Sequence, residues 1–199
     1  MSECHGCSVA AASPPSQGLA SKRRTVALVG PPNCGKTTLF NRLTGLRQKV
    51  ANFPGVTVEQ HLGRALATGD REVMIIDLPG IYSMQARSED EQVACDVLTG
   101  RMRGVDRPDA VLLVLDATNL GRHLVLAAQV LQQGLPTLVV LNMADELRGR
   151  GGDVDAAALS RQLGAPVALT SAAKGQGLDK ISRFLEGSTA NSPAPVPLM

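Results

Sequence analysis

The sequence contains very few aromatic residues. It has no tryptophan, one tyrosine and three phenylalanines, so that aromatic residues make up 2% of the 199 residues. A hydrophobic core must therefore be aliphatic, and hydrophobic residues are plentiful at 44% of the chain. This length suits one domain with flexible ends rather than two domains.

The chain also lacks a strong charge and an uninterrupted apolar segment. Its net charge of +2 is too small to indicate nucleic acid as a partner. The longest uncharged stretch, 124–144, contains three glutamines and is interrupted by Gly134-Leu135-Pro136. This pattern favours a helix end, a turn and a buried strand over a membrane span. Because the N-terminus has no secretory signal pattern either, we expect a soluble chain that faces the cytoplasm.

Cysteines are few. Cys4, Cys7, Cys34 and Cys95 do not suggest a disulfide framework in a cytosolic chain of this size. The segment C-H-G-C at residues 4–7 has metal-ligand spacing, but it lies in an Ala/Ser/Pro-rich stretch without a second half-site. A specific metal role and an unstructured N-terminus are the two interpretations of this segment.

Three parts are expected along the chain: an N-terminal tail at 1–21, a domain at 22–187, and a C-terminal tail or linker at 188–199. Within the domain we expect strands at 25–29, 56–66, 73–77, 110–116, 138–142 and 167–170, helices at 36–43, 88–98, 120–131, 155–163 and 178–185, a loop at 46–55 and a turn at 70–71. Ser88 and Glu91 have capping-box spacing, and Leu120, Leu124, Ala127, Ala128 and Leu131 share one helical face. The alternation of strands and helices predicts an α/β fold with a mostly parallel sheet and helices on both faces. Ligands of such sheets bind at the carboxyl ends of the strands.

A phosphate-binding loop is predicted between the first strand and the first helix. Residues 30–37 read G-P-P-N-C-G-K-T, in which the glycines let the backbone wrap phosphates and the amides point inward at a helix N-terminus. We expect Lys36 to neutralise the β and γ phosphates and Thr37 to hold Mg²⁺. The expected nucleotide contacts of this loop are Gly30, Pro31, Pro32, Asn33, Cys34, Gly35, Lys36, Thr37 and Thr38. A fortuitous glycine-rich turn is the alternative.

Cys34 lies near the N-terminus of the helix, where thiolate character is favoured. A redox-sensitive thiol and a small tolerated residue are both consistent with this position.

Two further segments are expected at the γ-phosphate. Asp77-Leu78-Pro79-Gly80 follows an apolar strand, so that Asp77 can reach Mg²⁺ through water and the Gly80 amide can contact the phosphate. Thr57, in Gly55-Val56-Thr57, can join the Mg²⁺ shell only when the γ-phosphate is present, which makes its loop an order–disorder switch. The alternatives are a simple strand-end turn and an ordinary β-branched strand residue.

Two segments are expected at the base. Asn142-Met143-Ala144-Asp145 ends an apolar strand, and the Asp145 carboxylate can accept hydrogen bonds from N1 and N2 of guanine, which adenine cannot offer. A simple N-cap pair is the alternative. Ser171, Ala172 and Ala173 follow the last strand, where the Ala172 amide can contact the guanine 6-oxo group.

Taken together, these motifs resemble the N-terminal cytoplasmic G domain of FeoB-type ferrous iron transport proteins over residues 24–186. The segments G-P-P-N-C-G-K-T-T-L-F-N, Q-K-V-A-N-F-P-G-V-T-V-E, D-L-P-G-I-Y-S and N-M-A-D carry the resemblance, and methionine is usual in that family at the position of Met143. The resemblance implies a Ras-like P-loop NTPase fold and a GTPase switch that regulates ferrous iron uptake at the cytoplasmic face of the inner membrane. It also implies a membrane permease region as a partner, with small Feo accessory proteins.

The resemblance also bears on hydrolysis. Ile81 stands where Ras-like enzymes have a catalytic glutamine, and isoleucine cannot orient water, so intrinsic turnover is expected to be slow. By similarity, Asn33 would hold a potassium ion that offsets developing charge, although it can also simply stabilise the loop. The expected catalytic group is Lys36, Thr57, Gly80 and Asn33, with Thr37, Thr57 and Asp77 at Mg²⁺.

The helical and permease regions of such transporters are not in this sequence, so it represents a fragment or a stand-alone G domain. Three other functions stay open: an Era-like RNA-associated GTPase, a non-hydrolysing GTP/GDP sensor, and a P-loop ATPase or kinase. An Era-like protein needs a basic RNA-binding domain, and Asp145 argues against adenine nucleotides.

Overall fold

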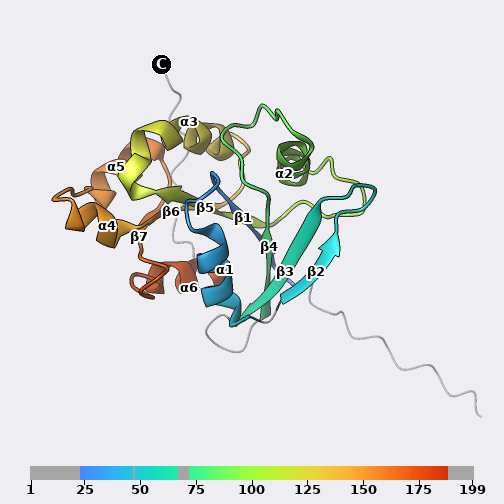
Figure 1. Cartoon of the computed structure of the whole chain (residues 1–199), viewed down its shortest axis with the longest axis horizontal. Coiled ribbons are helices and arrows are strands. Elements are labelled where there is room, and N and C mark those ends of the chain that lie inside the picture. Colours follow the sequence, from blue (N-terminus) through green and yellow to red (C-terminus); the bar gives the residue numbers. More distant parts are fainter. Residues whose placement is uncertain (1–22, 47, 67–71, 188–199) are drawn as a thin grey trace, which may run out of the picture.

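The centre of the molecule is a seven-stranded sheet with the strand order β2-β3-β4-β1-β5-β6-β7 (Figure 1). The structure, a computed structural model, describes residues 23–46, 48–66 and 72–187. The strands are β1 (Thr25–Val29), β2 (Gln48–Asn52), β3 (Glu59–Leu66), β4 (Glu72–Asp77), β5 (Ala110–Asp116), β6 (Thr137–Asn142) and β7 (Val167–Leu169). Strands β4, β1, β5, β6 and β7 run parallel, whereas β2 and β3 pair antiparallel. The expected mostly parallel sheet is confirmed.

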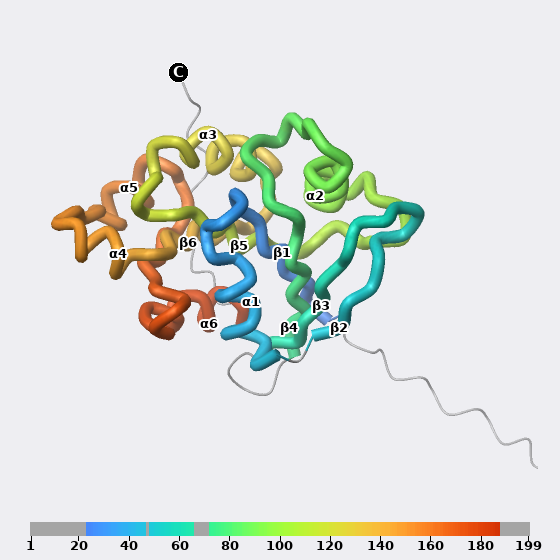
Figure 2. The backbone as a smooth tube through the Cα atoms, viewed as in Figure 1, coloured from blue at the N-terminus to red at the C-terminus, as the bar shows by residue number. Residues whose placement is uncertain are grey.

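Helices cover both faces of this sheet. They are α1 (Lys36–Thr44), α2 (Glu89–Thr99), α3 (Leu120–Leu131), α4 (Ala144–Gly149), α5 (Ala156–Leu163) and α6 (Asp179–Leu185), with the 3-10 turn η1 (Ala117–Asn119). Side chains of α2, α3 and α5 share one hydrophobic core with one face of the sheet. Side chains of α1 and α6 share a second core with the other face. Figure 2 follows the chain through these three layers, which confirms the predicted α/β fold.

Alternation along the central strands explains the two cores. Ala27 and Val29 of β1 lie in the core with α2, α3 and α5, whereas Val26 and Leu28 lie in the core with α1 and α6. Because both faces are covered, these strands are apolar at nearly every position, as buried parallel strands require. Strands β1 and β5 therefore have little contact with solvent.

Helix α2 begins at the predicted cap, with one difference. Ser88 Oγ accepts a hydrogen bond from the Glu91 backbone N–H at 3.2 Å. The Glu91 carboxylate accepts from the Arg87 N–H at 2.7 Å, one residue before the position that a capping box uses. Gly100, at φ 73°, ends the helix in the left-handed conformation.

The prediction of a loop at 46–55 was wrong, because Gln48–Asn52 forms strand β2 at the edge of the sheet. All five β2 side chains are exposed. Neither face of this strand is buried, so its sequence carries no alternating hydrophobic pattern. The strand predicted at 56–66 is shorter and begins at Glu59.

Two helical expectations also needed correction. The side chains that α3 buries are His123, Leu126, Ala127 and Val130, so the buried face is rotated from the predicted one. Leu120, Leu124 and Leu131 are only partly buried at its margin. Helix α4 was not predicted, because its six residues carry a single buried side chain.

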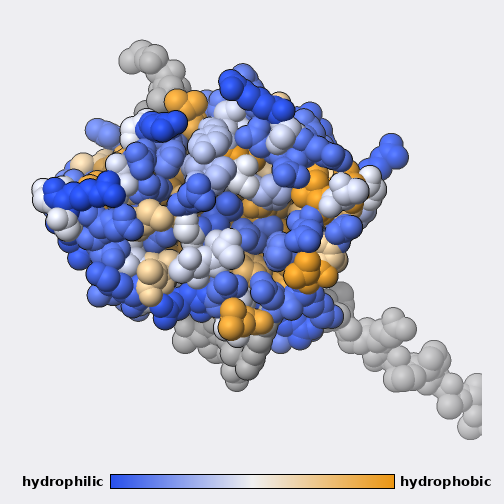
Figure 3. All heavy atoms as spheres, in the orientation of Figure 1, coloured by the Kyte–Doolittle hydropathy of each residue, from blue (hydrophilic) through white to orange (hydrophobic). Residues whose placement is uncertain are grey.

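Several expectations lie outside the described residues: the N-terminal tail at 1–21 with its C-H-G-C segment, the turn at 70–71, and the C-terminal segment 188–199. Within the described ranges, no helix has the length and apolar character to cross a membrane. Figure 3 shows a largely hydrophilic face with separate apolar patches. Among the described residues, the exposed large hydrophobic side chains are Leu46, Val50, Tyr82 and Val125.

Candidate nucleotide site

The predicted motifs meet at one edge of the sheet, where the parallel strands end. Leu28 is in register with Asp77 across β1 and β4, and Asp116 is in register with Asn142 across β5 and β6. The loops after β1, β4, β6 and β7 therefore lie together, as expected for the carboxyl edge of a doubly wound sheet.

The phosphate loop is tightly packed between its neighbours. A Cβ at Gly30 would clash with the Val114 carbonyl oxygen, and one at Gly80 would lie 2.9 Å from the Pro32 ring. The Ile81 N–H donates to the Gly30 carbonyl at 3.1 Å. Gly30 thus lets the phosphate loop lie against β5, and Gly80 lets the D-L-P-G segment lie directly on the phosphate loop.

Two residues of the phosphate loop adopt the left-handed helical conformation. Asn33 (φ 62°) and Gly35 (φ 85°) are left-handed, and Gly35 directly precedes the first residue of α1, Lys36. Successive right- and left-handed residues turn backbone amides toward a common point, which is the geometry of an anion-binding loop. The Asn33 side chain is exposed and has no hydrogen-bond partner within the described part of the chain.

A polar groove of about 420 Å³ opens beside this loop. It is lined by Lys36, Thr37, Thr57, Val58, Glu59, His61, Asp77, Leu78, Pro79, Gly80 and Asp90. All the residues predicted for the γ-phosphate and Mg²⁺ therefore border one groove. Thr57 is exposed and lies before β3 in the turn that the Phe53 N–H to Val58 carbonyl bond closes at 2.9 Å. Its alternative role as a strand residue does not hold.

Asp77 is the most unusual group in the groove. Its Oδ1 atom is buried without a hydrogen-bond partner among the described residues. Burial raises the pKa of Asp77, while nearby Lys36 and His61 act in the opposite direction. A buried carboxylate oxygen without a donor is suited to a cation or to a metal-bound water.

The sequence analysis missed three polar side chains of the groove, Glu59, His61 and Asp90, and the apolar Val58. His61 Nε2 lies 3.4 Å from a Glu59 carboxylate oxygen. His61 is also in register with Asp77 across β3 and β4. That register depends on the pairing of the two antiparallel strands, so only a correct hairpin alignment would have indicated His61.

At the base end, Asn142 connects three loops. Its side chain is 3% exposed. Nδ2 donates to the Cys34 carbonyl at 3.0 Å, and Oδ1 accepts from the Ala172 N–H at 2.9 Å and from Thr170 Oγ1 at 3.5 Å. The Ala172 amide, expected at the guanine 6-oxo group, is thus already hydrogen-bonded to Asn142.

Asp145 lies in the first turn of α4 and interacts with side chains of the neighbouring loop. Its Oδ2 atom is 3.1 Å from Lys174 Nζ. A hydrogen bond from the Ser171 side chain, followed by one from Lys174, lowers the pKa of Asp145 and keeps it ionised as an acceptor. The N-cap of α4 is Met143, which makes no side-chain cap bond, so the interpretation of this motif as an N-cap pair was wrong.

Burial decides how Cys34 and Ile81 can act at the site. The Cys34 side chain is 1% exposed, and burial raises the pKa of its thiol to about 11, despite opposing effects of Lys36. Of the two interpretations of Cys34, the raised pKa argues against a redox-sensitive thiolate and favours a small tolerated residue, because desolvation outweighs the helix N-terminus. Ile81 is fully buried and so has no contact with a water in the groove.

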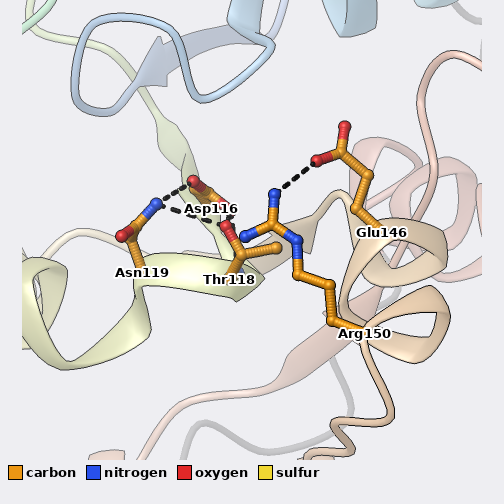
Figure 4. A network of polar contacts seen from close by, with 5 residues as sticks. All are labelled: Asp116, Thr118, Asn119, Glu146 and Arg150. Atoms are coloured by element: carbon orange, nitrogen blue, oxygen red, sulfur yellow. Dashed lines mark hydrogen bonds and ion pairs between the residues drawn. The ribbon is translucent and has the colours of Figure 1, made fainter.

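The loop after β5 is organised by a residue that the sequence analysis did not single out. Asp116 accepts from the Thr118 N–H at 2.8 Å, from Thr118 Oγ1 at 2.7 Å and from Asn119 Nδ2 at 2.6 Å, as Figure 4 shows. The same view shows Arg150 directed at Glu146 on α4, a pair 3.5 Å apart. The Asp116 cap gives η1 a defined shape beside the end of β6.

This chain is similar in sequence and in fold to parts of ferrous iron transporters. The family model described as ferrous iron transport protein B matches residues 24–185. The Fe(2+) transporter FeoB of Salmonella typhimurium is 42% identical over 175 residues, which cover 85% of this chain and 22% of that protein. That of Leptospira biflexa is 43% identical over 164 residues, 82% of this chain and 23% of that protein. The chain therefore spans about a fifth of the length of these relatives.

Solved structures agree with this assignment. A mutant of the S. thermophilus N-terminal FeoB domain bound to GDP is 42% identical with a TM-score of 0.76, and the match covers 86% of this chain and 63% of that one. The G domain of the T. maritima FeoB iron transporter is 37% identical with a TM-score of 0.73, and the match covers 83% of this chain and 98% of that one. The chain belongs to the ferrous iron transport protein B family and has the fold of its N-terminal G domain.

Proposed function

We propose that this chain binds GTP with Mg²⁺ and hydrolyses it to GDP and phosphate. The observation that carries the proposal is the buried, unpartnered Asp77 oxygen in one groove with Lys36, Thr37 and Thr57. This arrangement matches the needs of a triphosphate and its metal ion. The GDP found in related FeoB domains supports the same ligand class.

Guanine selectivity would come from Asp145. Its lowered pKa keeps the carboxylate able to accept from N1 and N2 of guanine, once it exchanges Lys174 for the base. Adenine offers no donor pair in that position, so the Asp145 carboxylate would be left without donors against the base. Ser171, Ala172 and Ala173 would complete the base site from the opposite side.

Five residues that border the groove would contact the phosphates or the metal ion. Lys36 and the loop amides would hold the β and γ phosphates, and the Gly80 amide would contact the γ-phosphate. Thr37, Thr57 and Asp77 would hold Mg²⁺, which when bound neutralises charge on the phosphate oxygens. Thr57, which is exposed and borders the groove, would join the Mg²⁺ shell when a γ-phosphate is present.

Turnover should be slow and stimulated by potassium. Buried Ile81 leaves the position of a water-orienting glutamine without a polar group. Asn33, which is exposed and unpartnered within the described residues, would hold K⁺ near the phosphates, where its charge offsets the charge of the transition state. A sensor that binds but does not hydrolyse GTP is the second candidate, and Ile81 burial is the observation that favours it.

The GTP cycle would regulate ferrous iron uptake. Relatives about four times as long as this chain are Fe(2+) transporters, so the natural partner would be a membrane permease region at the cytoplasmic face of the inner membrane, with small Feo accessory proteins. Cells whose gene for this protein carries Lys36→Ala should then lose most Fe²⁺ uptake. Undiminished uptake at normal protein levels would contradict this role.

The direct test measures phosphate release from GTP in potassium and in sodium buffers with Mg²⁺. We expect slow turnover that potassium raises, loss of both with EDTA, and a larger loss of turnover than of GDP affinity in Thr57→Ala. Binding of GTP without phosphate release in either buffer would favour the sensor. Failure to bind any guanine nucleotide would reject the proposed function.

A further inference from the structure

We propose that Arg42 is a positioning residue for base recognition, which holds the base loop (residues 171–176) and thereby sets how fast guanine nucleotide dissociates. This inference rests on the proposed function. It assigns a role to a side chain that contacts neither phosphate nor metal.

Arg42 makes two hydrogen bonds to the base loop across a large sequence separation. Its Nε donates to the Ala172 carbonyl at 3.1 Å, and one of its terminal nitrogens, Nη2, donates to the Ala173 carbonyl at 2.6 Å. Two donors on one rigid guanidinium fix both the position and the orientation of the peptide between them. The bonded carbonyls belong to the residues expected at the base.

The base loop is shaped to receive this guanidinium. Gly175 (φ 69°) turns the chain back, and a Cβ at that position would lie 3.1 Å from Arg42 Nη1. Ser171 and Gln176 close the loop through a backbone bond at 3.1 Å in each direction. The absence of a side chain at Gly175 therefore leaves room in the turn for the Arg42 guanidinium.

Asn142 holds the opposite side of the same peptide segment. The Ala172 N–H donates to buried Asn142 Oδ1, while the Ala172 carbonyl accepts from Arg42. Ala172 is thus fixed from the inside by Asn142 and from the outside by Arg42. Removing Arg42 leaves the inner contact in place, so the loop should loosen without the domain unfolding.

Helix α1 connects both ends of the nucleotide site. It begins with Lys36 at the phosphates and carries Arg42 in its last turn, roughly 9 Å further along the helix axis at 1.5 Å per residue. Loss of Arg42 should therefore weaken the base end alone. We expect faster dissociation of GDP with an unchanged rate of the chemical step at saturating GTP.

A purely structural role predicts a different result. A positive charge in the last turn of a helix stabilises its dipole, and lysine would serve that purpose as well as arginine. Lysine cannot donate from two fixed nitrogens to two carbonyls. Arg42→Lys should therefore behave more like Arg42→Met than like the wild type.

The experiment measures dissociation of a fluorescent GDP analogue by stopped flow and single-turnover GTP hydrolysis. We expect Arg42→Met to raise the dissociation rate about threefold to tenfold, as expected for lost charge-assisted bonds that are partly exposed. Its hydrolysis rate should stay within about twofold of wild type, and Arg183→Met on the exposed side of α6 should change neither. Unchanged dissociation in Arg42→Met, or full rescue by lysine, would overturn the proposal.

Hydrogen exchange of the nucleotide-free chain provides a second, ligand-independent measurement. Amides of the base loop should exchange faster in Arg42→Met, with α6 unaffected. Equal protection in wild type and variant would refute the positioning role. Absence of nucleotide binding by the wild type would instead reject the proposed function.

Discussion

Replacing Asn142 by alanine removes the side chain that links the phosphate loop to the base loop. Its amide donates to the Cys34 carbonyl at 3.0 Å and accepts from the Ala172 N–H at 2.9 Å, and both bonds are buried. A Cβ on Gly35 would clash with this amide, which shows how closely the amide fits the loop. Alanine would leave one buried carbonyl and one buried amide without partners.

The cost follows from those two orphaned groups. A buried polar group that loses its partner costs about 1–3 kcal/mol, so the pair should lower the free energy of unfolding by roughly 2–6 kcal/mol. For a domain of this size each kcal/mol shifts the melting temperature by about 2–4 °C, which predicts a fall of roughly 4–24 °C. The loss should persist without nucleotide, because both bonds join groups of the protein itself.

Thermal melting by circular dichroism and urea titration of the nucleotide-free protein measure this loss. Asn119→Ala is the matched control, since it removes an exposed amide that donates to Asp116 at 2.6 Å. It should change the free energy of unfolding by less than about 1 kcal/mol. A melting temperature for Asn142→Ala within about 2 °C of wild type would refute the link between these loops.

Four further predictions concern single side chains. Asp145→Asn should shift binding from guanine toward xanthine nucleotides, and unchanged selectivity in a competition assay would contradict its role at the base. Asn33→Ala should abolish potassium stimulation of GTP turnover while leaving GDP affinity nearly intact; a variant that potassium still stimulates would show that another group holds the ion. Ser88→Ala should cost about 1 kcal/mol of stability through loss of the hydrogen bond from the Glu91 N–H, as urea titration can measure, and no change would mean that water replaces this bond. Because burial raises the Cys34 pKa from 9.0 to about 11, the contribution of the buried neutral thiol to stability is complete below pH 9 and is lost as pH rises toward 11. Alkylation of Cys34 at pH 8, followed by mass spectrometry, should therefore be much slower in the folded than in the denatured chain. Equal alkylation rates would contradict the burial of Cys34.

Local patterns were sufficient for the parallel part of the fold. The strands at Thr25–Val29 and Ala110–Asp116 have the predicted bounds. Each is an apolar run that both cores bury, and burial on two faces leaves a signal in every residue of the strand. The candidate nucleotide motifs could also be predicted locally, because each places its residues at fixed spacing within one turn or loop, and Lys36, Thr37, Thr57, Asp77 and Gly80 do border one groove.

Features that depend on residues far apart in the sequence could not be predicted from local sequence patterns. Strand β2 is defined only by its pairing with β3, since all its side chains are exposed. The ionisation of Cys34 is decided by how deeply packing buries its thiol. The local sequence is equally compatible with a loop at 48–52 and with a thiolate at Cys34.

The sequence by itself determined the order of the phosphate, metal and base motifs, because each depends on neighbouring residues along the chain. Only the tertiary structure decided which groups these motifs meet, such as Lys174 beside Asp145 and Arg42 on the carbonyls of Ala172 and Ala173. The contacts of Arg42 span 130 and 131 residues, and such contacts arise only when the sheet brings the ends of its strands to one edge.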